Sequence, residues 1–256
     1  MIRWIGALAL AMTLTGPAHA ACRLALALAL DVSSSVDARE YRLQLDGLAG
    51  ALLDPDVQDA IFAMSPVNVR FMVYEWGDAN SQRVLVDWVE AETPADVEAL
   101  ANRLRATRAD SGRDATGLGR AIEFGARALQ TQSDCWQLTL DTSGDGPNND
   151  GPEPALLRDS PAMARVTVNA LVVSTDSTYA GVADRRQAEI KELLSYFHAR
   201  VITGPMAFAE VALSFEDFEA SMRRKLLREL AGLAVSDLGP NASDIATRAR
   251  LRTIDQ

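Results

Sequence analysis

The sequence is poor in the side chains that most often carry chemistry in proteins. It has two cysteines and two histidines among 256 residues. One histidine, His19, is close to the N-terminus and the other, His198, lies late in an expected helix, so no serine has a plausible histidine partner for a hydrolase triad. The two cysteines lack the spacing of a zinc site. The Gly-x-Gly pairs come without a Walker lysine or a complete dinucleotide fingerprint. These absences argue against the common hydrolase, zinc and nucleotide-binding classes.

Positive charge is also in short supply. The chain has 25 Lys and Arg against 35 Asp and Glu, a formal net charge of −10 at pH 7. Removing residues 1–20, which contain Arg3 and no acidic residue, changes the balance to 24 − 35 = −11. Such an acidic chain argues against nucleic acid, or an anionic membrane surface, as the partner.

Apart from stretches expected to form core strands, long apolar runs occur near the N-terminus. Arg3 is followed by the apolar stretch Ile5–Leu14 and by Ala18-His19-Ala20, a small-x-small cleavage pattern. This order predicts a secretory signal peptide over residues 1–20. No later stretch is long and apolar enough to predict a membrane span. We therefore expect a periplasmic or secreted protein.

The run Leu24–Leu30 is apolar without interruption and ends abruptly in Asp31-Val-Ser33-Ser-Ser35. A run without polar alternation is typical of a strand buried on both faces, in the middle of a parallel α/β sheet. Ligands bind at the carboxyl ends of such strands. Asp31, Ser33 and Ser35 offer three hard oxygens there at alternate positions, which suits a hard cation such as Mg²⁺.

The rest of the chain alternates between expected helices and strands. Further strands are expected at 67–76, 83–89, 136–142, 166–173 and 207–213, and helices at 37–53, 57–64, 93–107, 120–130, 184–199 and 215–234. This alternation predicts one doubly wound, mostly parallel α/β domain, of the Rossmann-like kind, over residues 21–234. The turn at 77–81 predicts one antiparallel strand at the sheet edge. Residues 235–256 lack an apolar period and are expected to form a C-terminal tail.

Cys22 and Cys135 each stand immediately before an expected core strand. If those strands are parallel neighbours, both cysteines lie at the amino ends of the strands, on the same edge of the sheet. An exported protein meets an oxidising compartment, so we predict a disulfide between them. Two free buried thiols are the alternative.

Two further loops are rich in oxygen ligands, Asp114-Ala-Thr116-Gly117 and Ser143-Gly-Asp145-Gly146. Together with Asp31-Val-Ser33-Ser-Ser35, they resemble the metal-ion-dependent adhesion site of von Willebrand factor type A domains. That site uses Asp-x-Ser-x-Ser after the first strand, a later Thr and then an Asp-Gly. The chain is also similar, over 40–44, 143–149 and 215–226, to exported bacterial proteins of unknown function that carry this domain.

The resemblance implies a set of metal ligands and a mode of binding. Ser33, Ser35 and Thr116 would bind Mg²⁺ or Mn²⁺ directly, while Asp31 and Asp145 would act through bound water and by orienting the hydroxyls. Neutral direct ligands leave the ion a strong Lewis acid, so a carboxylate of a partner protein would complete its coordination. The function implied is a non-enzymatic, exported binding module.

Several alternatives stay open at this stage. Asp31 and the serines are also typical helix-cap and turn residues. Asp141, at the end of its strand, is a rival to Asp145 as a ligand, and Asn148 and Asn149 are interpreted as turn formers. The function could instead be a Mg²⁺-dependent phosphate-ester hydrolase with Asp31 as nucleophile, although Ser33 stands where that chemistry uses a second acid. A structural scaffold with a degenerate site is a third hypothesis.

One charged run belongs to none of these sites. The last expected helix carries basic residues interleaved with acidic ones, a pattern interpreted as a solvated face. Its members are Arg223, Arg224, Lys225 and Arg228 against Glu216, Asp217, Glu219 and Glu229. The sequence leaves the oligomeric state open.

Overall fold

Strand β1 (Cys22–Asp31) lies in the middle of a sheet with the strand order β3-β2-β1-β4-β5-β6. The other strands are β2 (Asn68–Trp76), β3 (Gln82–Ala91), β4 (Gln137–Gly144), β5 (Val166–Val173) and β6 (Ala209–Ala212). Neighbours pair in parallel except β2 and β3, which are antiparallel. The predicted doubly wound sheet with an antiparallel edge strand is confirmed.

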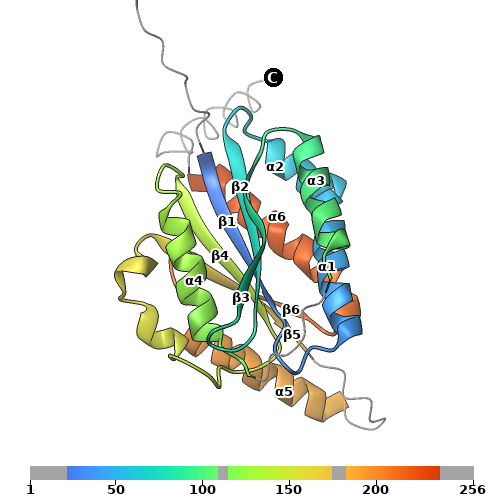
Figure 1. Cartoon of the computed structure of the whole chain (residues 1–256), viewed down its shortest axis with the longest axis vertical. Coiled ribbons are helices and arrows are strands. Elements are labelled where there is room, and N and C mark those ends of the chain that lie inside the picture. Colours follow the sequence, from blue (N-terminus) through green and yellow to red (C-terminus); the bar gives the residue numbers. More distant parts are fainter. Residues whose placement is uncertain (1–21, 109–114, 175–182, 237–256) are drawn as a thin grey trace, which may run out of the picture.

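The structure is a computed structural model that describes residues 22–108, 115–174 and 183–236 (Figure 1). The expected signal peptide, Asp114 and residues 237–256 of the expected tail lie outside this part of the chain. Within it, no helix has both the length and the apolar character needed to cross a bilayer.

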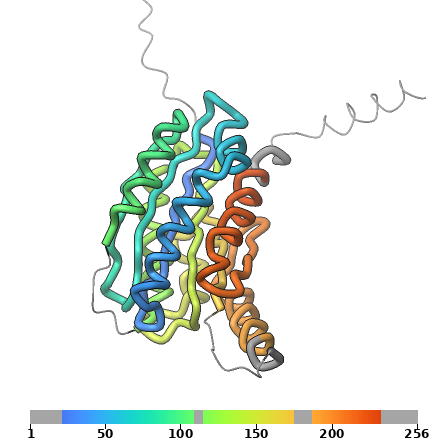
Figure 2. The backbone as a smooth tube through the Cα atoms, turned by 90° about the vertical axis from the view of Figure 1, so that its right-hand side faces the viewer, coloured from blue at the N-terminus to red at the C-terminus, as the bar shows by residue number. Residues whose placement is uncertain are grey.

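Helices cover both faces of the sheet. One face carries α1 (Ala38–Leu53), α2 (Pro55–Phe62), α3 (Pro94–Ala106) and α6 (Phe218–Ser236), and the other carries α4 (Leu118–Gln130) and α5 (Ala183–Tyr196). Short 3₁₀ turns at Pro154–Leu157, Pro161–Met163 and Phe215–Asp217 and a π-helical turn at Phe197–Val201 complete the described elements. Figure 2 shows α3, α1 and α6 side by side on one face.

Large and small side chains alternate along the uninterrupted apolar run of β1. Its four leucines point to the core beneath α1 and α6, and its three alanines point to the core beneath α4. The small alanines leave room on the α4 side for Tyr74, Trp76 and Phe197, which are all fully buried. Because successive side chains of a strand face opposite ways, this alternation fixes which face each residue of β1 presents.

Helix α1 has its own capping residue. The Asp37 side chain accepts hydrogen bonds from the N–H groups of Arg39 and Glu40, at 2.7 and 2.8 Å, and the Glu40 side chain accepts one from the Asp37 N–H. This is a capping box. Asp31 therefore does not cap the helix that follows it.

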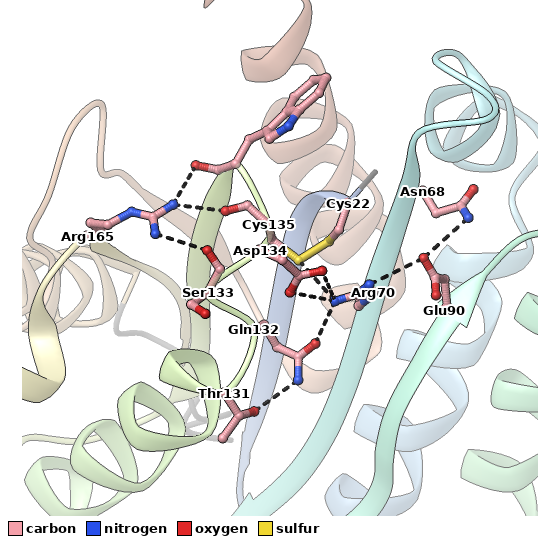
Figure 3. The surroundings of a disulfide bond; sticks show 11 residues. Cys22, Asn68, Arg70, Glu90, Thr131, Gln132, Ser133, Asp134, Cys135 and Arg165 are labelled. Carbon is pink, nitrogen blue, oxygen red and sulfur yellow. Dashed lines mark hydrogen bonds and ion pairs between the residues drawn. A yellow bond between two sulfur atoms is a disulfide. The ribbon is translucent and has the colours of Figure 1, made fainter. Parts of the chain in front are cut away.

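The amino ends of β1 and β4 are held by the predicted cysteine pair. A disulfide bond joins Cys22 to Cys135, 113 positions away (Figure 3). Beside it, Arg70 on β2 donates to Asp134 at 2.9 Å and to Gln132 at 3.1 Å. Arg165 donates to the Cys135 carbonyl at 2.9 Å from the other side. The turn before β4 is thus fixed covalently and by two arginines.

Candidate metal centre

The carboxyl ends of β1 and β4 lie side by side at the end of the strands opposite the disulfide, which is the lower end of the sheet in Figure 1. β1 ends at Asp31, β4 ends at Gly144 and Asp145 follows directly. The Asp31 N–H donates to the Ser143 hydroxyl at 3.1 Å, which joins the two strand ends. Neighbouring parallel strands therefore bring together segments that lie over a hundred residues apart in the sequence.

Four of the five predicted ligands form one chain of hydrogen bonds. The Ser33 N–H donates to Asp31 Oδ1 at 2.8 Å, and the Ser33 and Ser35 hydroxyls lie 3.1 Å apart. The Ser35 hydroxyl donates to Asp145 Oδ1 at 2.8 Å. Two hydroxyls thus lie between two carboxylates, one from each loop.

The fifth predicted ligand, Thr116, is joined to this group through its backbone. Its N–H donates to Asn149 Oδ1 at 2.8 Å, and its carbonyl accepts from the N–H groups of Asn149 and Asp150 at 3.0 and 3.2 Å. Thr116 lies just before α4, on the loop that packs against the loop carrying Asp145. The Thr116 loop therefore packs against the loop that carries Asp145, and this contact links Thr116 indirectly to the other predicted ligands.

The two carboxylates are only partly satisfied by these bonds. Asp31 Oδ2 and Asp145 Oδ2 are buried and have no hydrogen-bond partner among the described residues. No basic side chain in that part of the chain forms an ion pair with either of them. Buried carboxylates without a partner are costly, and none of the described residues supplies this pair with a positive charge.

Burial and proximity of the two acids have a direct electrostatic effect. Burial, and after it the nearby charge of Asp145, raise the pKa of Asp31 to about 7. Burial also raises the pKa of Asp145. Both shifts mean that the negative form is disfavoured in this environment. A divalent cation held by the adjacent hydroxyls would relieve both, and oxygen donors of this kind fit Mg²⁺.

The cluster has a buried end and an end that is accessible. Asp31 and Ser33 are 2% and 1% exposed, whereas Asp145 is half-buried and Ser35 is exposed. A hollow of about 380 Å³ adjoins Asp145, between the end of β5 and α5. Its walls include Pro147, Ile190, Leu193 and Tyr196, with Glu189 and Glu192 also lining it. Among the described residues, this hollow leads from the surface toward the cluster.

One residue that holds the site in place was not predicted. The buried Gln44 of α1 donates from Nε2 to the Asp31 carbonyl at 2.8 Å, and its Oε1 accepts from the Ser143 hydroxyl at 3.1 Å. The available signal was its position, since Gln44 stands three residues after Tyr41 and four before Leu48 on the apolar stripe of the helix. A polar residue on such a stripe indicates a buried polar partner.

The two asparagines interpreted as turn formers connect loops. Asn148 Oδ1 accepts from the Gly119 N–H at 3.0 Å, and the Asn148 N–H donates to the Tyr196 hydroxyl at 3.0 Å. Together with the Asn149–Thr116 bond, these contacts attach the loop after β4 to α4 and α5. Their role in the structure is to position the site.

The rival ligand Asp141 faces away from the cluster. Its carboxylate forms an ion pair with Lys225 Nζ of α6 at 2.7 Å. Lys225 is fully buried and Glu229 is 7% exposed, so the interpretation of the last helix as a wholly solvated face was wrong for these two residues. Arg223 and Arg224 do pair with acidic residues at the surface, Asp54 and Glu210 respectively.

The described residues contain no group of three His, Cys, Asp or Glu side chains that could hold a metal ion. Any metal at this edge would therefore depend on hydroxyl oxygens as well as on the two carboxylates.

A family model described as "Protein of unknown function (DUF1194)" matches residues 21–234. A comparison with curated proteins finds no match. Among solved structures, the pilus adhesin SpaC from Lactobacillus rhamnosus GG, in its open conformation, matches with a TM-score of 0.55 at 15% identity, covering 83% of this chain and 30% of that chain.

Two other solved structures carry the same fold. A von Willebrand factor type A protein from Catenulispora acidiphila matches with a TM-score of 0.50 at 12% identity, covering 82% of this chain and 43% of that chain. Proximal thread matrix protein 1 from the mussel byssus, in a structure with a zinc-occupied MIDAS (metal-ion-dependent adhesion site) motif, matches with a TM-score of 0.51 at 16% identity, covering 82% and 46%. The fold is therefore that of von Willebrand factor type A domains, and the chain spans less than half of each of these three proteins.

Proposed function

The chain belongs to the DUF1194 family, and we propose that it is an exported, non-enzymatic binding module with a metal-ion-dependent adhesion-type site at Asp31, Ser33, Ser35, Thr116 and Asp145. The partner would be a protein that supplies a carboxylate. The observation that carries the proposal is a pair of buried oxygens, Asp31 Oδ2 and Asp145 Oδ2, that have no hydrogen-bond partner among the described residues and belong to the two carboxylates bonded to the Ser33 and Ser35 segment.

The chain's own residues divide the work of holding a cation. The hydroxyls of Ser33, Ser35 and Thr116 are neutral donors, and the two carboxylates compensate charge and orient those hydroxyls, as the Ser35–Asp145 bond at 2.8 Å illustrates. A Mg²⁺ or Mn²⁺ ion bound there supplies Lewis acidity toward a carboxylate of the partner. Gln44 and Ser143 keep the two strand ends in register beneath it.

The hollow beside Asp145 adds to the binding role. Its apolar wall from Ile190, Leu193 and Tyr196 is large enough to receive a side chain that neighbours the partner's carboxylate. The exposed Glu189 and Glu192 favour a basic residue nearby in the same partner.

Binding is favoured over phosphate-ester hydrolysis by the position of Asp31. A nucleophile must reach its substrate, whereas Asp31 is 2% exposed and its Oδ1 already accepts from the Ser33 N–H. The exposed end of the cluster is a hydroxyl, Ser35.

Isothermal titration with MgCl₂ tests the metal site. We expect saturable binding by the wild type and by Glu98→Ala, a control that removes an exposed acid on α3, and loss of binding in Asp31→Ala. Absence of saturable Mg²⁺ or Mn²⁺ binding by the folded wild type would overturn the proposal.

The partner is tested separately by a pull-down from a periplasmic or culture-supernatant fraction, with Mg²⁺ present and again with EDTA. A protein retained only with Mg²⁺ supports the adhesion role, and retention that survives both EDTA and Asp31→Ala contradicts it.

A further inference from the structure

Lysine is rare in this chain and one lysine has an unusual place. Of the 25 basic residues 23 are arginine and two are lysine, Lys191 and Lys225. Lys191 is exposed on α5, whereas Lys225 on α6 is fully buried. Arginine is the usual choice for buried ion pairs because its fork satisfies two oxygens and holds its charge. A lysine at the buried position, in a chain that otherwise uses arginine, calls for a chemical reason.

Lys225 lies between two buried acids. Its Nζ is 2.7 Å from Asp141 Oδ2 on β4 and 2.7 Å from Glu229 Oε1, one turn further along α6. The exposed fractions of the three side chains are 0%, 1% and 1%. The Phe208 ring centroid lies 5.1 Å from the same nitrogen, so the group is shielded from water on that side.

The charges of this group do not balance. One cation faces two carboxyl groups, and Asp141 Oδ1 and Glu229 Oε2 are buried without a hydrogen-bond partner among the described residues. Burial raises the pKa of Asp141 to about 7, with Lys225 opposing the shift and Glu229 adding to it. An ion pair in this setting recovers little of its desolvation cost. Transfer of a proton from the lysine to a carboxyl group would leave a neutral amine beside a neutral carboxylic acid.

We propose that Lys225 and Asp141 react to form an intramolecular amide bond, with Glu229 as the proton carrier. The neutral Lys225 amine attacks Cγ of the protonated Asp141 carboxyl group and a C–N bond forms. Glu229 accepts a proton from the attacking nitrogen and delivers one to the departing hydroxyl as the C–O bond breaks. The products are a secondary amide and one water molecule, and no oxidant or cofactor is consumed.

The surroundings supply what this step needs. Asn169 Nδ2 donates to Glu229 Oε1 at 2.8 Å, which holds the proton carrier beside the amine. A cavity of about 370 Å³, lined by Glu229, Asn169 and Thr139 among others, adjoins the group and gives the released water a way out. Arginine could not replace Lys225, because its guanidinium does not give up its proton in proteins.

The amide would join α6 to β4 across the core. This site is separate from the candidate metal centre, so the proposal does not depend on metal binding. It predicts that the two elements cannot separate even in a denatured chain.

The test begins with the intact mass of the purified protein after reduction of the disulfide. Formation of the amide lowers the mass by about 18 Da relative to that calculated for the measured N-terminus. Proteolysis should yield one branched peptide that contains both Asp141 and Lys225. A mass equal to the calculated value, with separate linear peptides, overturns the proposal.

Amine labelling gives an independent readout with an internal control. After denaturation, acetic anhydride should modify Lys191 and the α-amino group fully and leave Lys225 unmodified. Full acetylation of Lys225 in the wild type contradicts the amide.

The variants Glu229→Gln and Lys225→Arg should both show the full calculated mass, because one loses the proton carrier and the other the nucleophile. Asp141→Asn keeps a reactive carbonyl and should release ammonia, so its product should have the mass of the wild-type product. If Glu229→Gln forms the amide to the wild-type extent, the role of Glu229 is wrong. Because the wild-type mass decides the main question alone, a variant that fails to fold does not affect that result.

Discussion

Two aspartates near the end of β4, Asp141 and Asp145, differ in what balances their charge. Asp141 is within the strand and faces the fully buried Lys225 of α6 at 2.7 Å. Asp145 follows the strand and faces the Ser35 hydroxyl and a second carboxylate, that of Asp31. Among the described residues, the fold supplies a lysine to the first and hydroxyls to the second. Under the two proposals made above, the first acid is satisfied within the fold and the second takes an ion from solution.

The strongest way to break this comparison is to remove the buried lysine. Lys225→Met prevents the proposed amide and also removes the basic partner that the described residues give to two buried carboxyl groups, and we expect the free energy of unfolding to fall by about 3–5 kcal/mol. Urea unfolding followed by circular dichroism measures it. Lys191→Met, at an exposed position, should change the free energy of unfolding by less than about 0.5 kcal/mol. Equal effects of the two variants would show that the buried group contributes nothing.

The dependence of the free energy of unfolding on pH tests the other side of the comparison, the pair formed by Asp31 and Asp145. The pKa of Asp31 is raised to about 7 from an ordinary 3.8, so the folded metal-free protein binds the proton more tightly than the unfolded chain does. Its contribution to stability is therefore present below pH 4 and is lost as the pH rises toward 7 and above, at about 1.4 kcal/mol per unit of pKa difference. Bound Mg²⁺ should replace the proton and reduce this loss.

In protein that has not formed the Lys225–Asp141 amide, Asp141, whose pKa is also raised to about 7, contributes a loss of the same sign. Only the loss of stability that is due to Asp31 should become smaller when Mg²⁺ is added. Urea unfolding at pH 5 and pH 8, with and without MgCl₂, should show stabilisation by Mg²⁺ chiefly at pH 8, and this stabilisation should disappear in Asp31→Asn. Equal stabilisation of Asp31→Asn would place the Mg²⁺ effect elsewhere.

The variant Gly119→Ala should move the loops of the site without changing a proposed ligand. A Cβ on Gly119 would lie 1.8 Å from the Pro152 carbonyl oxygen, so the loop after β4 must shift away from α4. For Gly119→Ala we expect a loss of about 1–3 kcal/mol in the free energy of unfolding, together with weaker Mg²⁺ binding in a calorimetric titration. Gly146→Ala is the matched control, since nothing lies within 4 Å of its Cβ. Unchanged Mg²⁺ affinity in Gly119→Ala would mean that the Thr116 loop is not part of the site.

The smallest expected change in stability is at the exposed end of the cluster. Ser35→Ala removes a hydroxyl that donates to Asp145, and because Ser35 is exposed the free energy of unfolding should change by less than about 0.5 kcal/mol. Its Mg²⁺ affinity should nevertheless fall by at least about tenfold, as for other lost groups around a metal. A titration in which wild type and Ser35→Ala bind equally would remove Ser35 from the ligand set.

What the sequence predicted depended on strong local patterns. The buried β1 carries an uninterrupted apolar run, the turn at 77–81 predicted the antiparallel β3, and the pairing of the cysteines followed from strand neighbourhood. β4 extends two residues beyond the prediction, to Gly144, because Ser143 finds polar partners in the tertiary structure that no local pattern reveals.

The errors at two buried polar residues share one cause. Lys225 was interpreted as exposed and Gln44 was not singled out, because polarity in a helix usually means exposure. Here each meets a partner from another element, Asp141 in one case and the Asp31 carbonyl in the other. Such pairs depend on how distant elements pack, which the spacing of residues in a single sequence does not contain.

The leucine and alanine alternation of β1 has a consequence for how this protein can change. Loss or gain of one residue within Leu24–Leu30 would turn leucines toward Tyr74 and Phe197, where only alanine fits. It would also rotate Asp31 out of its bond with Ser143. A change in the length of this strand would therefore disrupt the core and the proposed cation site together.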